Sequence, residues 1–146
     1  MEFDYIVVGA GSAGCAVANR LSQCGNFLVA LIEAGPSDNS PWIHVPVGYY
    51  RTMGNPKSDW CYRTQSDEGI AGRSIPWPRG KVMGGSSSIN GLLYVRGQPR
   101  DFDIWSQLGC TGWSWDEVLP YFKRSENWDG IDETGLRGKD GPLSVQ

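Results

Sequence analysis

The sequence predicts an α/β fold that opens with a βαβ unit, and three observations support this. Residues 3–8 and 27–32 are short apolar runs rich in β-branched and aromatic types, as is typical of buried parallel strands. Between them, residues 12–23 place apolar side chains at helical spacing, and Gly25 follows where a helix would end. A strand, a helix and a strand in about 30 residues form a βαβ unit with a right-handed crossover.

Residues 36–79 show no regular periodicity. Prolines recur through this stretch, with tryptophans and tyrosines between them. Its composition is neither repetitive nor acidic enough to favour disorder. We therefore expect an ordered loop that packs through its aromatic side chains.

The remaining sequence predicts two helices and the start of a strand. Residues 101–108 have helical character, and Ser114 with Glu117 fits a capping box that opens a second helix. Pro120 is expected to kink that helix or to confine it to its first turns. Residues 142–145 are expected to form a strand.

Gly9, Gly11 and Gly14 form a G-x-G-x-x-G pattern where the first predicted strand meets the helix. Gly9 permits the tight turn, Gly11 lets the backbone approach a pyrophosphate, and Gly14 lets the helix lie against the strand. The N–H groups of the first helical turn, at the positive end of the helix dipole, then bind the phosphates. Glu33 ends the second strand, where an acid hydrogen-bonds the adenosine ribose. The unit is therefore expected to bind a dinucleotide.

The glycine motif leaves NAD, NADP and FAD open as the cofactor. Glu33 disfavours NADP, because its carboxylate would meet the 2′-phosphate. NAD and FAD share the same ADP moiety. The Glu33-Ala34-Gly35 ending resembles one common in FAD-binding Rossmann proteins, which favours FAD without settling the choice.

A second motif, at residues 80–103, decides the cofactor. It reads Gly-Lys-Val-Met-Gly-Gly-Ser-Ser-Ser-Ile-Asn from residue 80 and continues through Tyr94, Gly97 and Asp103. It resembles the first sequence signature of the glucose-methanol-choline (GMC) oxidoreductase family. Further strings extend the resemblance to residues 3–145, and to the branch of choline dehydrogenases and bacterial alcohol dehydrogenases. These are Asp59-Trp60, Arg73-Ser74, Trp77-Pro78-Arg79, Tyr94-Val95-Arg96-Gly97, Gly112-Trp113-Ser114-Trp115 and Leu119-Pro120-Tyr121-Phe122.

The resemblance implies that residues 1–146 are the N-terminal part of a Rossmann-like FAD-binding domain, incomplete relative to the family. Four segments are then expected within it. They are the ADP-binding βαβ unit at 1–35, the aromatic and proline-rich loop at 36–79, the flavin-contacting signature at 80–103, and helices with the start of the next strand at 104–146.

The resemblance also implies which residues hold FAD. In the family the signature runs beneath the flavin and along its ribityl-pyrophosphate chain, so Gly84 and Gly85 are expected to offer N–H groups to the ligand. FAD is expected to be non-covalent, because Ile89 stands where some members carry a histidine bonded to the flavin. The expected cofactor-binding residues are Gly9, Gly11, Ser12, Ala13, Gly14, Glu33, Ala34, Val82, Gly84, Gly85, Asn90, Gly91, Leu92 and Leu93.

The activity implied is oxidation of an alcohol CH–OH group, with hydride transfer to flavin N5. Its partners would be a small alcohol substrate and an electron acceptor. The family's acid–base histidine lies near the C-terminus of much longer chains, so no catalytic residue is expected among these 146. The alternative is a truncated, non-catalytic nucleotide-binding remnant. The coding sequence after Gln146 distinguishes the two: an open frame that continues to a second signature and a late histidine supports the enzyme, and a stop codon supports the remnant.

Composition argues against several other classes. The net charge of −3, without a run of more than two basic residues, disfavours a nucleic-acid partner. Four scattered cysteines and a single histidine disfavour a metal site. No apolar run reaches the roughly 20 residues of a membrane span. With no leader sequence recognised, a cytoplasmic protein is expected, and peripheral membrane association stays open.

Some chemically suggestive residues are expected to be structural. His44, the only imidazole, lies among apolar neighbours and is expected to be packed and hydrogen-bonded rather than a base. Two pairs of acidic residues that lie close together in the sequence are expected to cap helices or face solvent rather than to act as catalytic carboxylates. Packing is also favoured over a substrate cavity for three aromatic residues. The acids are Asp101, Asp103, Asp116 and Glu117, and the aromatic residues are Trp60, Tyr62 and Trp77.

Overall fold

The structure is a computed structural model that describes residues 2–146. The chain divides into two compact units, one ending at Leu93 and the other spanning Tyr94–Gln146. Each unit has its own strands and helices, and each is described separately below.

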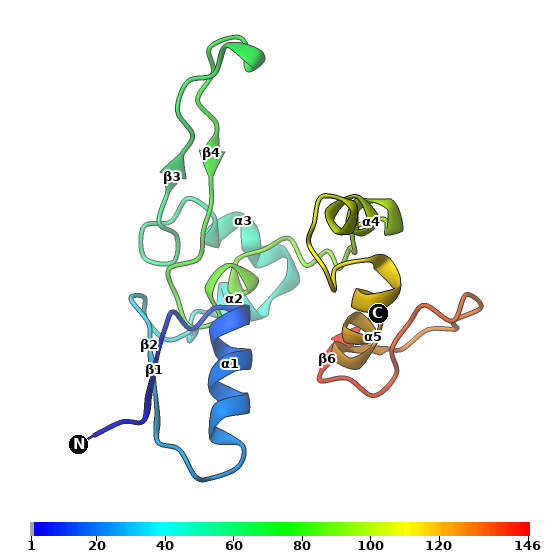
Figure 1. Ribbon diagram of the computed structural model, residues 1–146. Coiled ribbons are helices and arrows are strands. Elements are labelled where there is room, and N and C mark those ends of the chain that lie inside the picture. Colours follow the sequence, from blue (N-terminus) through cyan, green and yellow to red (C-terminus); the bar gives the residue numbers. More distant parts are fainter. Residues whose placement is uncertain (1) are drawn as a thin grey trace. The chain divides into compact units, whose positions relative to one another are not determined.

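The first unit begins with the predicted βαβ arrangement (Figure 1). Strand β1 (Tyr5–Val8) runs parallel to β2 (Val29–Ile32), and helix α1 (Ser12–Ser22) connects them. The strands pair in register from Tyr5 opposite Val29 onward. Both strands start two residues later than the apolar runs and end with them, because the parallel pairing begins only at Tyr5 and Val29. The predicted α/β class and the βαβ unit are confirmed.

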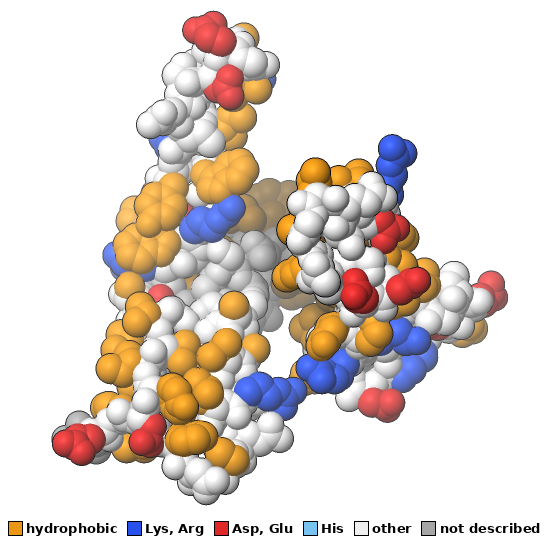
Figure 2. Space-filling view, in the orientation of Figure 1, with side chains coloured by type: hydrophobic (Ala, Val, Ile, Leu, Met, Phe, Trp, Pro, Cys, Tyr) orange, Lys and Arg blue, Asp and Glu red, His pale blue; other side chains and the backbone are white. Residues whose placement is uncertain are grey.

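Most side chains of this two-stranded sheet stay exposed. Ile6 is 62% exposed, Val8 82% and Ile32 51%, and Figure 2 shows apolar side chains gathered on the surface of this unit. Two strands and one helix offer too little surface to cover both faces of a sheet. The buried part of the unit therefore lies elsewhere, where Ala10, Val82 and Ile89 are each at most 1% exposed.

Residues 36–79, expected to form a loop, contain short elements that the sequence did not predict. Three one-turn helices come first, and a narrow antiparallel hairpin follows, with another short helix at its tip (Figure 1). Prolines start two of the helices, where their missing N–H has no cost. The elements are α2 (Pro41–His44), η1 (Pro46–Gly48), α3 (Tyr49–Thr52), β3 (Tyr62–Arg63), η2 (Glu68–Ile70) and β4 (Pro76–Trp77).

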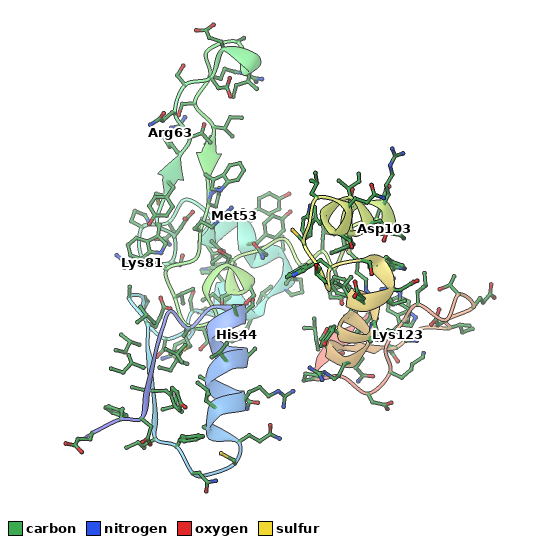
Figure 3. All side chains as sticks on the ribbon, in the orientation of Figure 1. His44, Met53, Arg63, Lys81, Asp103 and Lys123 are labelled. Atoms are coloured by element: carbon green, nitrogen blue, oxygen red, sulfur yellow. The ribbon has the colours of Figure 1, made fainter. Side chains whose placement is uncertain are left out.

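Aromatic and basic side chains interleave at the base of this hairpin. The rings of Trp60 and Tyr62 are parallel with centroids 5.9 Å apart, and the Lys81 ammonium lies 4.8 Å from the Trp60 centroid. Arg79 lies over Trp77 in the same way, at 5.0 Å. Figure 3 labels Lys81 beside the base of the hairpin. These aromatic side chains remain 41–51% exposed, so the expected packing is partial and is made with cations rather than with a core.

The second unit contains the two predicted helices and a short parallel sheet. Helix α4 (Pro99–Gln107) and helix α5 (Trp115–Ser125) precede β5 (Glu126–Trp128), which pairs with β6 (Leu143–Val145). The expected capping box is present, since the Ser114 N–H donates to Glu117 Oε2 at 3.0 Å. The expected strand near residue 143 is confirmed.

The expectation that Pro120 confines α5 to its first turns is wrong, because the helix continues to Ser125. Proline removes one backbone hydrogen bond in the second turn. The side chains beyond it compensate: Phe122 lies 5.6 Å from Phe102, and the Arg96 guanidinium lies 5.4 Å from the Phe122 ring. Phe102 is itself only 7% exposed. Tertiary packing thus overrides the local preference.

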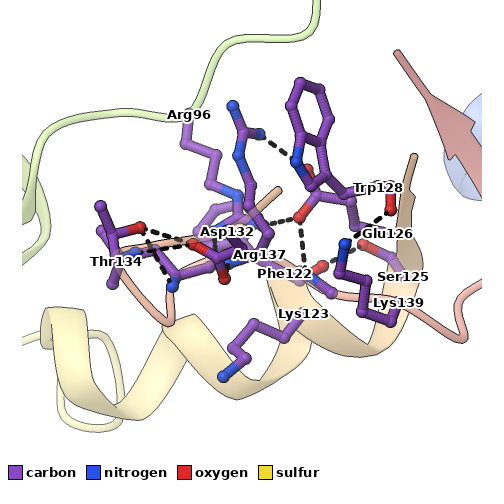
Figure 4. A network of polar contacts seen from close by, with 12 residues as sticks. Arg96, Phe122, Lys123, Ser125, Glu126, Trp128, Asp132, Thr134, Arg137 and Lys139 are labelled. Carbon is purple, nitrogen blue, oxygen red and sulfur yellow. Dashed lines mark hydrogen bonds and ion pairs between the residues drawn. The ribbon is translucent and has the colours of Figure 1, made fainter. Parts of the chain in front are cut away.

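A buried carboxylate organises the second half of this unit (Figure 4). Glu126 is fully buried and pairs with the guanidinium groups of Arg96 and Arg137. It also accepts the Gly138 N–H at 2.8 Å. Burial by itself raises the pKa of Glu126, but Gly138, Arg137 and Arg96 lower it, and the net pKa lies below the usual 4.5. The ionised carboxylate therefore holds together three segments that are distant in sequence.

Glu126→Ala is expected to lower the free energy of unfolding at pH 7 by about 3 kcal/mol, because two guanidinium groups would lose a buried counter-charge. Since the native pKa lies below 4.5, this contribution is complete above pH 4.5 and declines as the pH falls through the native pKa. Urea unfolding at pH 7 and in acid measures both effects. Exposed Glu133→Ala serves as the control and should change stability by less than about 0.5 kcal/mol. Equal stability of the two variants would show that the network is not stabilising.

Candidate functional site

The two glycine motifs, far apart in sequence, meet in the first unit. The Gly84 N–H donates to the Ala10 carbonyl oxygen at 2.8 Å, and Gly11 pairs with Gly84 as in a parallel sheet. On the other side, the Met83 N–H donates to the Pro36 carbonyl oxygen at 2.9 Å. The second motif is thus held between the loop after β1 and the loop after β2.

Several glycines are required because the backbone segments approach so closely. A Cβ on Gly85 would lie 2.8 Å from Gly11 Cα. A Cβ on Gly80 would lie 2.1 Å from the Gly85 carbonyl oxygen, and one on Gly35 would lie 2.0 Å from the Lys81 carbonyl oxygen. Each position would clash with backbone, which cannot move aside as a flexible side chain can. The two motifs can therefore pack this closely only because glycine has no side chain at these positions.

The turn between β1 and α1 has the geometry of an anion-binding loop. Gly9 has φ +92°, which favours glycine, and a Cβ on Gly14 would lie 1.9 Å from the Gly9 carbonyl oxygen. A Cβ on Gly11 would have only Gly85 Cα nearby, at 3.9 Å, so space remains beside Gly11. No side chain caps the start of α1, and its first turn contains no acid. These features suit a pyrophosphate at the helix N-terminus.

Glu33 lies beside this loop. One carboxylate oxygen accepts the Ala10 N–H at 2.8 Å and the other accepts the Gly35 N–H at 3.0 Å. Each carboxylate oxygen can accept a further hydrogen bond, so both remain able to receive a hydroxyl group. Glu33 therefore stabilises the loop and also presents an acceptor next to it, while the neighbouring Ala34 is exposed.

The second motif does not offer its glycine N–H groups to a ligand, contrary to expectation. The Gly84 N–H is bonded to Ala10 and the Gly85 N–H donates to the Val82 carbonyl oxygen at 2.7 Å. The Ser87 and Ser88 hydroxyls also bond backbone carbonyls in the same segment. A sequence does not show which backbone N–H groups are free to bind a ligand, and in a tight turn such as this one they bond to carbonyl oxygens of the chain itself. The contribution of Gly84 and Gly85 to a ligand site is therefore the absence of side chains rather than hydrogen-bond donors.

The predicted flavin-contacting residues occupy two different environments. Val82 and Ile89 are 1% exposed, so their side chains belong to the core of the first unit. The stretch from Asn90 onward is exposed and ends that unit; Leu92 has φ +61° there and is 62% exposed, and Leu93 is 88% exposed. Val82 is buried as a whole residue and its carbonyl oxygen accepts the Gly85 N–H, whereas Asn90, Leu92 and Leu93 have exposed side chains.

Three structural residues of this site were missed by the sequence reasoning. Gly35 and Gly80 permit the close approaches described above, and their place directly beside each motif was the available signal. Asp59 is 2% exposed and accepts three backbone N–H groups. One of its hydrogen bonds reaches Arg79, 20 positions away, and the sequence marked Asp59 only as part of the Asp59-Trp60 string.

Most of the titratable side chains that the sequence singled out have hydrogen-bond partners in the structure. His44 is hydrogen-bonded, with Nε2 2.7 Å from the Asp38 carbonyl oxygen, but it is exposed rather than packed as expected. Asp101 and Glu117 cap helices, and Asp103 accepts the Trp115 N–H at 3.0 Å. Residues 2–146 contain no cluster of three or more metal-ligating side chains. Within the same range, every helix is too short or too polar to cross a bilayer.

Comparison with known proteins places these residues in a wider set. The family model described as GMC oxidoreductase matches residues 3–146. The oxygen-dependent choline dehydrogenase of Vibrio vulnificus is 52% identical over 145 residues, which are 99% of this chain and 26% of that protein. The enzyme of the same name from Brucella anthropi is 50% identical over the whole chain and is also covered to 26%. The chain thus spans about a quarter of the length of these relatives.

Solved structures give the same result. The pyridoxine 4-oxidase from Mesorbium loti is 41% identical, with a TM-score of 0.87 over 98% of this chain and 28% of its own. A formate oxidase of Aspergillus oryzae, studied for the modification of its FAD, is 34% identical with a TM-score of 0.84 over 97% of this chain and 26% of its own. The predicted N-terminal part of a Rossmann-like FAD-binding domain is confirmed.

Gly14→Ala is expected to destabilise the protein although alanine is the better helix former. The new Cβ would lie 1.9 Å from the Gly9 carbonyl oxygen. The resulting overpacking, about 1–3 kcal/mol or more, exceeds the helix-propensity gain of about 1 kcal/mol. Urea unfolding measures the difference. Gly91→Ala, where a Cβ meets nothing within 4 Å, is the control. A stabilised Gly14→Ala variant would contradict the close contact between helix and turn.

Proposed function

The chain belongs to the GMC oxidoreductase family of FAD-dependent flavoproteins, and from this we propose that it supplies the ADP-binding and flavin-contacting part of an FAD site. The observation that carries the proposal is the meeting of the two glycine motifs at Gly11, Gly84 and Gly85. It leaves room beside an uncapped helix N-terminus, next to the carboxylate of Glu33. An ADP group needs these same three features.

Most of the predicted cofactor-binding residues then have a proposed role. Gly11 and the first-turn N–H groups of Ser12, Ala13 and Gly14 bind the pyrophosphate. Glu33 accepts the ribose hydroxyls, and the stretch from Asn90 to Leu93 contacts the flavin. Ile89 is a buried hydrocarbon that cannot bond to the flavin, so FAD is held without a covalent link at this position.

We further propose that the complete protein oxidises the CH–OH group of a small alcohol, such as choline. This rests on the choline dehydrogenases among the relatives, of which the chain covers 26%. Bound FAD supplies the hydride acceptor. The residues of this chain bind and orient the cofactor, and the histidine that takes the hydroxyl proton lies outside them. An electron acceptor completes the reaction.

Gly11→Val tests the assignment of the phosphate loop. The side chain would fill the space beside Gly11, so the purified full-length protein is expected to lose its flavin absorbance near-completely. Gly25→Asn is the matched control at the other end of α1. A Cβ there meets nothing, and asparagine tolerates the φ of +71°. A Gly11→Val variant that retains flavin like the control would show that the phosphate lies elsewhere.

The purified 146-residue chain is expected to show no oxidation of choline or aliphatic alcohols with an artificial electron acceptor. Its one imidazole, His44, is exposed and hydrogen-bonded to the Asp38 carbonyl oxygen. Retained flavin can be measured in the same sample by its absorbance. Turnover by the pure chain would contradict the proposal that the proton acceptor lies beyond these residues.

A further inference from the structure

Asp59 is the most deeply buried aspartate of the first unit, with 2% of its surface exposed. Its Oδ2 accepts the Gly54 N–H at 2.7 Å. Its Oδ1 accepts the N–H groups of Cys61 and Arg79, both at 2.9 Å. The partners of this carboxylate are thus three backbone amides from three separate stretches of chain.

One of these amides leads directly into the second glycine motif. Arg79 precedes Gly80, and Asp59 pairs with Gly80 as in an antiparallel sheet. The Trp60 N–H donates to the Arg79 carbonyl oxygen at 2.9 Å, and the Lys81 N–H donates to the Ser58 carbonyl oxygen at 2.8 Å. The backbone from residue 79 to residue 81 is therefore held along its length by residues 58–60.

The other end of this segment, at Gly84 and Gly85, contacts the glycine loop of residues 9–14, which is proposed to bind the pyrophosphate. Two residues after Lys81 the chain bonds to Pro36, and then Gly84 bonds to Ala10. Gly85 approaches Gly11 so closely that a Cβ on Gly85 would clash with Gly11 Cα. A displacement of the backbone at residue 79 would thus move Gly84 and Gly85 relative to Gly11.

The carboxylate also maintains a backbone shape that the sequence would not adopt unaided. Cys61 has φ +54°, in the left-handed region that non-glycine residues rarely occupy. The bond from its N–H to Asp59 Oδ1 offsets this strain. Burial alone raises the pKa of Asp59, but the N–H groups of Cys61, Gly54 and Arg79 bring it below the usual 3.8, so the group is ionised at neutral pH.

We propose that Asp59 is a positioning residue for the cofactor: its carboxylate holds residues 79–85 at the distance at which Gly84 and Gly85 meet Gly11. This inference rests on the proposed FAD site. Asp59 acts through the backbone that it binds, because its carboxylate accepts the N–H groups of Gly54, Cys61 and Arg79 rather than binding a ligand.

The test compares Asp59→Ala with Asp67→Ala in the full-length protein. Asp67 is the matched control, because it also binds a backbone amide, Gly69 N–H at 2.7 Å, but at the tip of the hairpin. Hydrogen exchange of backbone amides in the FAD-free protein is the first measurement. Asp59→Ala is expected to accelerate exchange at Arg79, Lys81 and Gly84, whereas Asp67→Ala accelerates it only at the hairpin tip.

FAD affinity, measured by flavin fluorescence, is the second measurement. Asp59→Ala is expected to raise the Kd about tenfold, the equivalent of one buried amide left unpaired. Asp67→Ala should leave the Kd unchanged. Faster exchange at Gly54 and Cys61 alone, with wild-type exchange at Gly84 and an unchanged Kd, would overturn the proposal.

Asp59→Asn keeps the proposal testable if the alanine variant does not fold. Its single amide oxygen can still accept the Cys61 and Arg79 N–H groups, while its NH2 faces the Gly54 N–H. Exchange should then accelerate at Gly54 and stay slow at Gly84, with the Kd between those of wild type and alanine. If wild-type protein binds no FAD, the proposed function fails, and exchange at Gly84 alone decides whether Asp59 positions the segment.

Discussion

The close approach of two backbone segments is the constraint on which the first unit depends. Gly84 and Gly85 lie against Gly11, and a Cβ on Gly85 would clash with Gly11 Cα. Gly35 and Gly80 allow equally tight contacts on either side of the same segment. The apolar strands contribute little to burial by comparison, since most of their side chains are exposed. Backbone packing through glycine, more than a hydrophobic core, shapes the space proposed for the cofactor.

Carboxylates bind backbone amides at the points where this packing could open. Glu33 joins the loop after β1 to the loop after β2, and Asp59 joins three stretches beside the second motif. In the second unit, Glu126 does the same for Gly138 and adds two arginine partners. Charge-assisted hydrogen bonds to N–H groups are stronger than neutral ones, which suits them to regions with few apolar contacts. A carboxylate that accepts backbone N–H groups thus occurs in both units.

Local patterns predicted the elements well wherever the relevant forces act between near neighbours. The βαβ unit, the helix near residue 103 and the capping box at Ser114 each depend on residues within one turn or one strand. Pro120 does not confine α5 to its first turns, because the packing of Phe122 against Phe102 compensates for its lost hydrogen bond. The short helices and hairpin of residues 36–79 escaped prediction because each is too short to show a period.

The sequence by itself determined the α/β class, the dinucleotide loop and the family, because glycine spacing and motif order are properties of the chain alone. Only the tertiary structure decided which groups remain available to a ligand. It directed the Gly84 and Gly85 N–H groups inward, gave Glu33 its two amide partners, and placed Asp59 beside Arg79. The physical reason is that a buried polar group must find a partner, and that partner is set by which distant segments folding brings together.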